Sequence, residues 1–179
     1  MARNRFQKDY QLIETADEKG RIRTTFRYRG PAYTFEGQPH QVAVLKKRLP
    51  VLTAASWIFW LAGMGWVSHA MHFLPAAIAY AMCAVPMAVL VECVFSFRRM
   101  QGPLESRHAD RMNNRYPAAG AFLIVCSILA LSGGAVSWIR SGMLLPGDGL
   151  FLVCAAALFL TGVYAFRCRK QIRIRKEKS

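Results

Sequence analysis

Long apolar stretches separated by short polar breaks fill most of the chain. Four of them occupy residues 49–70, 73–97, 118–139 and 149–166. Each is close to the roughly 17–25 residues that a helix needs to cross a hydrocarbon core about 30 Å thick. Because no water satisfies backbone groups inside a bilayer, stretches of this kind are expected to be helical. The pattern predicts an all-α membrane protein, built as a bundle of four transmembrane helices.

The first 48 residues are polar and follow a different period. Residues 10–15 predict a short strand, residues 16–21 a turn, and residues 22–28 a strand in which side chains alternate in character. Its predicted faces are Ile22, Thr24, Phe26 and Tyr28 on one side, and Arg21, Arg23, Arg27 and Arg29 on the other. Residues 32–35 add a third short strand. The sequence therefore predicts a small N-terminal β-hairpin element attached to the helical bundle.

An isolated two-stranded hairpin is marginally stable in water. The apolar face of this hairpin is therefore expected to cover a third strand, the membrane helices or a partner. Two interpretations of the arginine face remain open. It is either a cationic platform for lipid headgroups or an acidic partner, or the solvated face of an ordinary hairpin.

Basic residues are distributed unequally between the polar segments. They gather in residues 1–48, in the loop 98–117 and in the polybasic tail 167–179, whereas the two remaining links contain only Arg140. This asymmetry predicts that both termini and the middle loop are cytoplasmic. The net charge of +14 then faces anionic inner-leaflet lipid, and no nucleic acid is expected as a partner. No apolar stretch precedes residue 49, so no signal peptide is expected, and the compact loops favour a bacterial cytoplasmic membrane.

The loop 98–117 has a repeat of four residues. Apolar or aromatic positions recur at Leu104, His108, Met112 and Tyr116, and a parallel stripe is formed by Arg107, Arg111 and Arg115. This pattern is typical of a short amphipathic helix on the inner leaflet, with its guanidinium groups at lipid phosphates. A flexible loop is the alternative. His108 and Glu105 have no nucleophile or metal-ligand spacing beside them, so we do not expect a catalytic site here.

The second apolar stretch contains two unusual residues. Pro86 is expected to kink the helix, and Glu92 is the only acidic residue within the four stretches. A carboxylate inside a membrane is a functional hypothesis by default, for proton or cation coupling or for pairing with a basic residue. Glu92 lies six residues before Arg98, about 9 Å of helix rise. The alternative is therefore that Glu92 reaches the inner surface or pairs with Arg99.

Small residues mark the contact expected between the third and fourth helices. They are Gly133, Gly134, Ala157, Thr161 and Ala165. Small side chains let helices approach closely in lipid, so these two helices are predicted to pack as an antiparallel pair.

Other residue types give no sign of a metal or cofactor. His69 and His72 supply two ligands where a structural zinc site needs four, so they are interpreted as part of a polar turn. The five cysteines form no CxxC pair, which argues against a disulfide framework. We expect no catalytic residue, cofactor or metal.

These features favour a non-enzymatic integral membrane protein. The leading hypothesis is an accessory, regulatory or scaffold subunit of a membrane assembly, in contact with lipid and with another membrane protein or a second copy of itself. The alternative is a small homo-oligomeric transporter or channel, in which Glu92 is the coupling carboxylate and Pro86 lets the second helix move. An enzyme acting on lipid is a third class, and His108 with Glu105 is its only visible starting point.

Overall fold

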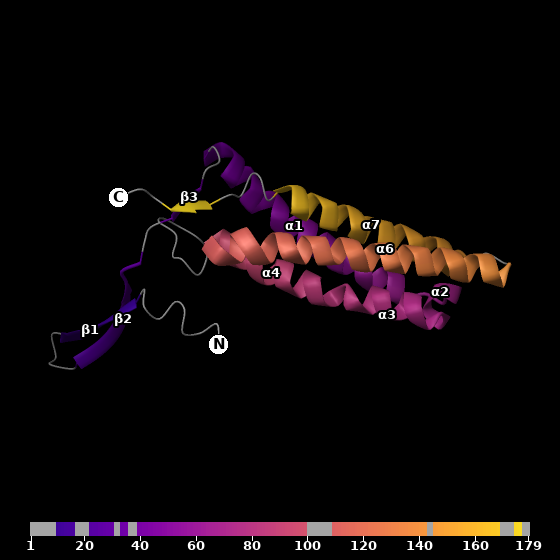
Figure 1. Ribbon diagram of the computed structural model, residues 1–179, viewed down its shortest axis with the longest axis horizontal. Helices are drawn as coiled ribbons and strands as arrows, with labels where there is room; N and C mark the ends of the chain where they lie inside the picture. The colour runs from indigo at the N-terminus through magenta and orange to yellow at the C-terminus, as the bar shows by residue number, and fades with distance from the viewer. Residues whose placement is uncertain are drawn as a thin grey trace.

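Long helices make up most of the molecule, and strands lie at one end of them (Figure 1). The computed structural model describes residues 10–16, 22–30, 33–35, 39–99, 109–142, 145–168 and 174–176. The helical elements are α1 (Pro39–Met64), α2 (His69–His72), α3 (Leu74–Met82), α4 (Ala84–Arg99), the π-helical turn η3 (Arg111–Arg115), α6 (Tyr116–Ser141) and α7 (Pro146–Cys168).

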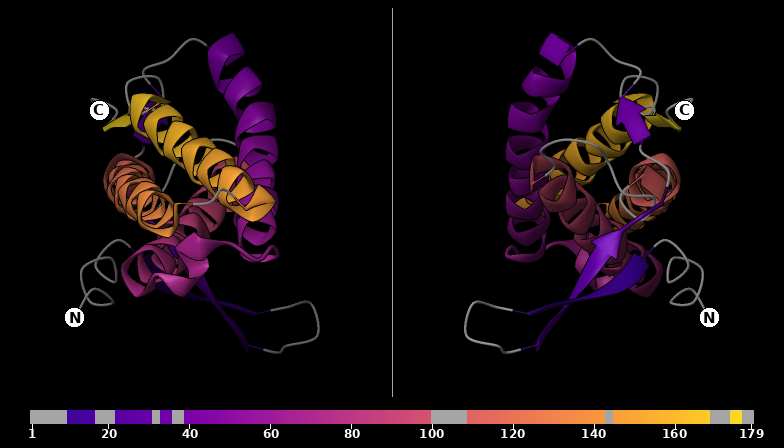
Figure 2. Two further views of the ribbon diagram at one scale, coloured as in Figure 1. Left: turned by 90° about the vertical axis from the view of Figure 1, so that its right-hand side faces the viewer. Right: turned by 90° about the vertical axis from the view of Figure 1, so that its left-hand side faces the viewer.

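The helices form a closed, four-sided bundle. Helix α7 packs between α6 and α1, and the α3–α4 pair closes the opposite side by contacting both α6 and α1 (Figure 2). Basic residues gather where α1 begins and where α4 and α7 end, including Lys47, Arg48, Arg98, Arg99 and Arg167. We call this end of the bundle the basic end.

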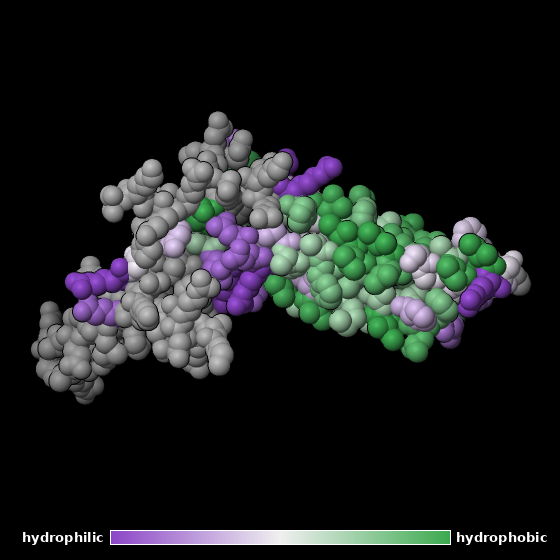
Figure 3. Space-filling view, in the orientation of Figure 1, coloured by the Kyte–Doolittle hydropathy of each residue, from purple (hydrophilic) through white to green (hydrophobic). Residues whose placement is uncertain are grey.

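Three helical segments are long and apolar enough to cross a membrane. They are Leu74–Arg99, Arg111–Ser141 and Pro146–Cys168. Figure 3 shows the apolar surface as a broad band over the helices. The structure thus supports a polytopic membrane protein and three of the four predicted spans. Helix α1 is continuous, but it is not in this set because Lys46, Lys47 and Arg48 lie in its first half and leave a shorter apolar part.

The second predicted span is interrupted near its middle. Helix α3 ends at Met82 and α4 begins at Ala84, with Cys83 between them. The amide of Cys83 donates to the Tyr80 carbonyl three residues earlier, which is a tighter turn than an α-helix makes. Pro86 has no N–H to offer the Met82 carbonyl four residues before it, so the break falls one turn ahead of the proline.

The strands form two separate pairs. β1 (Tyr10–Ala16) and β2 (Ile22–Tyr28) are antiparallel, with Tyr10 opposite Tyr28 and Ala16 opposite Ile22. β3 (Tyr33–Phe35) does not join them. It pairs with β4 (Ile174–Lys176), which comes from the C-terminal tail. The N-terminal segment and the tail therefore meet at the basic end of the bundle (Figure 1).

Residues 174–176 of the tail are held against the bundle by η3 as well as by β3. The side-chain amide of Asn113 donates to the Ile174 carbonyl at 3.0 Å and accepts from its amide at 3.2 Å. Ile174 is buried among the residues of the core. This two-point amide contact, together with pairing to β3, fixes the tail against η3.

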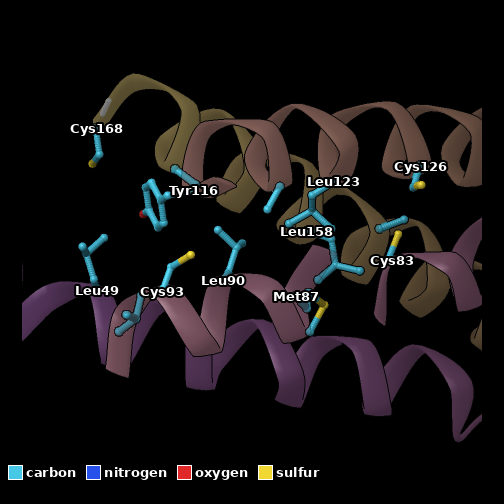
Figure 4. Close-up of a cluster of buried hydrophobic side chains, with 14 of the residues drawn as sticks. Leu49, Cys83, Met87, Leu90, Cys93, Tyr116, Leu123, Cys126, Leu158 and Cys168 are labelled. Atoms are coloured by element: carbon cyan, nitrogen blue, oxygen red, sulfur yellow. The ribbon is translucent and has the colours of Figure 1, made fainter. Parts of the chain in front are cut away.

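The interior of the bundle is apolar and filled by side chains from every long helix. Leu49, Met87, Tyr116, Leu123 and Leu158 meet there (Figure 4). All five cysteines are buried and none forms a disulfide.

One reciprocal contact holds α1 against α3. The Tyr80 hydroxyl donates to the Phe59 carbonyl at 3.0 Å, and the Trp60 indole donates to the Tyr80 carbonyl at 3.0 Å. Trp57 stacks edge-on against Trp60, with ring centroids 5.4 Å apart. Trp60 therefore joins α1 to α3, and both tryptophans pack partly buried against the core.

The small residues of α6 and α7 are used inside the bundle. A Cβ on Gly134 would lie 2.9 Å from the Phe151 ring of α7, while one on Gly133 would lie 2.8 Å from Ala76 of α3. Ala165 is buried beside Gly120 of α6.

Thr161 and Ala157 lie one turn apart on α7. Thr161 donates to the Ala157 carbonyl and accepts from Ser56 of α1 at 3.3 Å. Close contact in lipid depends on such small side chains, and here they join helices of one chain.

Candidate functional site

A cluster of three polar side chains joins α4 to η3 near the basic end. The guanidinium of Arg111 lies 3.1 Å from the Glu92 carboxylate and donates to the Ser96 hydroxyl at 3.3 Å. Glu92 and Ser96 are one turn apart on α4, so a single guanidinium reaches both. The Glu92 side chain is 48% exposed and that of Arg111 is 17% exposed. Glu92 is therefore a partly exposed carboxylate paired with Arg111, a residue the sequence placed in a separate loop helix.

The π-helical turn η3 sets the position of Arg111. The amide of Tyr116 donates to the Arg111 carbonyl, five residues back, and α6 follows directly. Met112 and Tyr116 are buried, while Arg115 is exposed. Arg111 and Arg115 are thus part of the helix that continues into α6. Arg107, and the rest of the predicted amphipathic segment before Ala109, lie outside the described residues.

The arginines predicted for the hairpin face are placed only in part. Arg23 and Arg27 lie in β2, and Arg29 follows it and is exposed. Arg21 lies outside the described residues, as do Glu105 and His108.

A second polar cluster lies at the opposite end of the bundle, where α2 meets the start of α7. The Nδ1 of His69 donates to the Asp148 carboxylate at 2.8 Å, and the His69 backbone amide donates to its other oxygen at 2.7 Å. The Leu145 amide donates to the same carboxylate at 3.0 Å. The Asp148 side chain is only 3% exposed. A carboxylate this buried persists because three donors surround it.

Asp148 has this environment because of how α7 begins. Pro146 occupies the first helical position, and Asp148, two residues later, reaches back to the Leu145 amide that precedes the helix. This is the N3-to-Ncap half of a capping box, because Leu145 has no side-chain acceptor to complete the other half. It places a negative charge at the positive end of the helix dipole.

Gly147 is what lets α2 approach this helix start. A Cβ at Gly147 would collide with the Val67 carbonyl. The absence of a side chain there allows the chain before α2 to lie directly against the first turn of α7.

The residues of this second cluster carry separate local patterns in the sequence. Pro-Gly-Asp before an apolar stretch is a helix start, and His69 was interpreted as part of a polar turn. Nothing in the spacing of two residues 79 positions apart shows that they meet. Among the described residues, no three His, Cys, Asp or Glu side chains gather as a metal site would require.

No protein-family model matches this chain, and no curated protein and no solved structure is significantly similar to it.

Proposed function

We propose that this chain is a non-enzymatic accessory or scaffold subunit of a membrane assembly, which binds its partner through the β1–β2 hairpin. The observation that carries the proposal is the position of the hairpin. It projects from the basic end of the bundle, and its strands contact each other far more than any other described element (Figure 1).

Each strand of this hairpin has one neighbour only within the described part of the chain. Each therefore offers one edge of backbone donors and acceptors, which is the template for strand addition by another protein. The register puts Leu12 opposite Phe26 and Tyr10 opposite Tyr28. Aromatic and aliphatic residue types therefore stand at paired positions along the two strands.

Helix α1 is proposed as the fourth membrane span. It runs along α7 and α4, and it reaches α3 through Tyr80 and Trp60. Val51, Ile58 and Leu61 are more than half exposed on its surface, as expected for a helix in lipid. With four spans the hairpin and the tail lie on one side of the membrane, and the basic residues favour the cytoplasm for that side.

The alternative, a transporter that uses Glu92, receives less support from this geometry. The carboxylate is half exposed and paired, whereas the interior between the helices is filled by apolar side chains. Small-residue contact with a partner is also disfavoured as a docking mode, because Gly134 and Ala165 are engaged within the chain.

Site-directed photo-crosslinking tests the proposal. A photoreactive residue is placed at Thr24 or Tyr28 of the hairpin in the full chain, and at Val125 of α6 as control, which is 53% exposed on the helical surface. We expect both hairpin positions to give an adduct with one and the same polypeptide and Val125 to give lipid adducts. Lipid adducts from all three positions would overturn the proposal.

A further inference from the structure

A groove runs between α1 and α7 from the basic end of the bundle. Its outer part has a volume of about 490 Å³ and is lined by His40, Arg48, Tyr164 and Arg167 among others. Its inner part, of about 470 Å³, is lined by Arg48 and Tyr164 again, by Lys47 at the same end, and by the apolar residues Val51, Leu52 and Ala55. Because the two parts share Arg48 and Tyr164, they adjoin.

The outer part of the groove is suited to an anion. Arg48 of α1 and Arg167 of α7 approach it from opposite walls, with the His40 imidazole and the Tyr164 hydroxyl beside them, and no carboxylate is among its described lining residues. A guanidinium presents paired N–H groups that match phosphate oxygens, and two of them from different helices surround the phosphate instead of merely attracting it.

The inner part of the groove is suited to a hydrocarbon chain. Val51, Leu52 and Ala55 form its α1 wall. From Arg48 to Ala55 the helix rises about 10 Å, so the groove runs from the charged residues into the apolar part of the bundle. Since α7 is one of the helices long and apolar enough to cross a membrane, a groove along it would open toward one leaflet of the bilayer.

We propose that this α1–α7 groove is a binding site for one anionic phospholipid from the leaflet at the basic end. The phosphate lies between Arg48 and Arg167, and one acyl chain lies along Val51, Leu52 and Ala55. Charge complementarity at one end and an apolar wall at the other select this ligand over a zwitterionic lipid and over a soluble anion. The inference goes beyond the docking proposal and does not depend on it.

Lipid titration followed by mass spectrometry of the intact protein tests the site. The full chain is purified in detergent, and binding of phosphatidylglycerol is compared with that of phosphatidylcholine. We expect one phosphatidylglycerol to bind more tightly than phosphatidylcholine. Arg48→Gln and Arg167→Gln should each weaken phosphatidylglycerol binding about fivefold, the factor expected for one basic residue near an anionic lipid. Arg99→Gln is the matched control, an exposed arginine at the same end that is not among the residues lining the groove.

A second pair of variants tests the acyl-chain part. Ala55→Phe fills the groove, and Ala88→Phe places the same side chain at an exposed position of α4 that does not line it. We expect loss of lipid binding in the first variant and not in the second. Should Ala55→Phe fail to fold, Val51→Trp fills the same groove from a position that is 69% exposed.

Four outcomes would overturn the assignment. Equal weakening by Arg99→Gln would mean attraction to surface charge in general. Loss of lipid binding in Arg98→Gln, with binding retained in Arg48→Gln and Arg167→Gln, would place the lipid in the groove between α1 and α4, which Arg98 lines. Unchanged lipid binding in both groove-filling variants, Ala55→Phe and Val51→Trp, would show that the acyl chain does not bind in this groove. Displacement of the lipid by millimolar inorganic phosphate would make the site one for a soluble anion.

Discussion

The imidazole of His69 and the carboxylate of Asp148, 79 positions apart in the chain, lie 2.8 Å apart where α2 meets the start of α7. The same carboxylate accepts the backbone amides of His69 and Leu145. One side chain therefore joins the link between the first two predicted spans to the link between the last two. It holds together the end of the bundle opposite the hairpin.

Replacing Asp148 by alanine should lower stability by roughly 2–4 kcal/mol, because three donors would lose their acceptor at a buried position. Thermal unfolding in detergent micelles measures the effect. His72→Ala, at an exposed position on the same short helix, is the control and should unfold at the wild-type temperature. Wild-type stability of Asp148→Ala would show that the carboxylate does not hold this junction.

Gly147→Ala tests the close approach of the chain before α2 to α7. The added methyl group would meet the Val67 carbonyl, so we expect a loss of about 1–3 kcal/mol, as for other overpacked sites. Gly149 is two residues further along the same helix, and a Cβ there would have no neighbour within 4 Å. Gly149→Ala should therefore be neutral, or stabilising by up to about 1 kcal/mol through helix propensity. Similar unfolding temperatures for the two variants would contradict the described contact.

Glu92→Gln separates the accessory proposal from the transporter alternative. The carboxylate is half exposed in its pair with Arg111, so its removal should cost at most about 1 kcal/mol. Proton flux into vesicles that contain the purified protein should be the same for wild type and variant, when followed with a pH-sensitive dye. Flux that is present in the wild type and lost in Glu92→Gln, with assembly unchanged, would favour the transporter.

Cysteine labelling tests whether α1 is a span and which way it runs. The five native cysteines are buried, so they give little background. Lys47 is exposed at the basic end of the apolar part of α1, and Val67 is exposed just beyond the last residue of the helix. In intact cells a membrane-impermeant thiol reagent should modify Val67→Cys, whereas Lys47→Cys should react only after permeabilisation. Labelling of both from the same side would mean that α1 does not cross the membrane.

The sequence predicted the elements that depend on local patterns. Apolar stretches longer than a soluble helix usually sustains predicted the three helical segments that are long and apolar enough to cross a membrane. Alternation along the chain predicted the strands β1 and β2. These features depend on residues that are close together in the chain, so the sequence alone is enough to predict them.

Contacts between segments that are distant in the chain could not be predicted from the local pattern of residues. A strand near the C-terminus is indicated by the alternation of Ile172, Arg173 and Ile174. This alternation does not predict that β4 pairs with β3. In the same way, several arginines lie near Glu92 in the chain, and the sequence does not show which of them pairs with it. The choice of Arg111 depends on the π-helical turn that carries it over α4. Ion pairs and tail docking of this kind are decided by tertiary packing.

The mass of the intact complex tests the central claim most directly. The protein is extracted from its native membrane in mild detergent and weighed whole, once as wild type and once with Phe26→Ser and Tyr28→Ser in β2. The account predicts a wild-type mass that contains another polypeptide, and loss of that polypeptide in the variant while the chain itself stays folded. A symmetric assembly of this chain alone, with the same mass in both proteins, would contradict it.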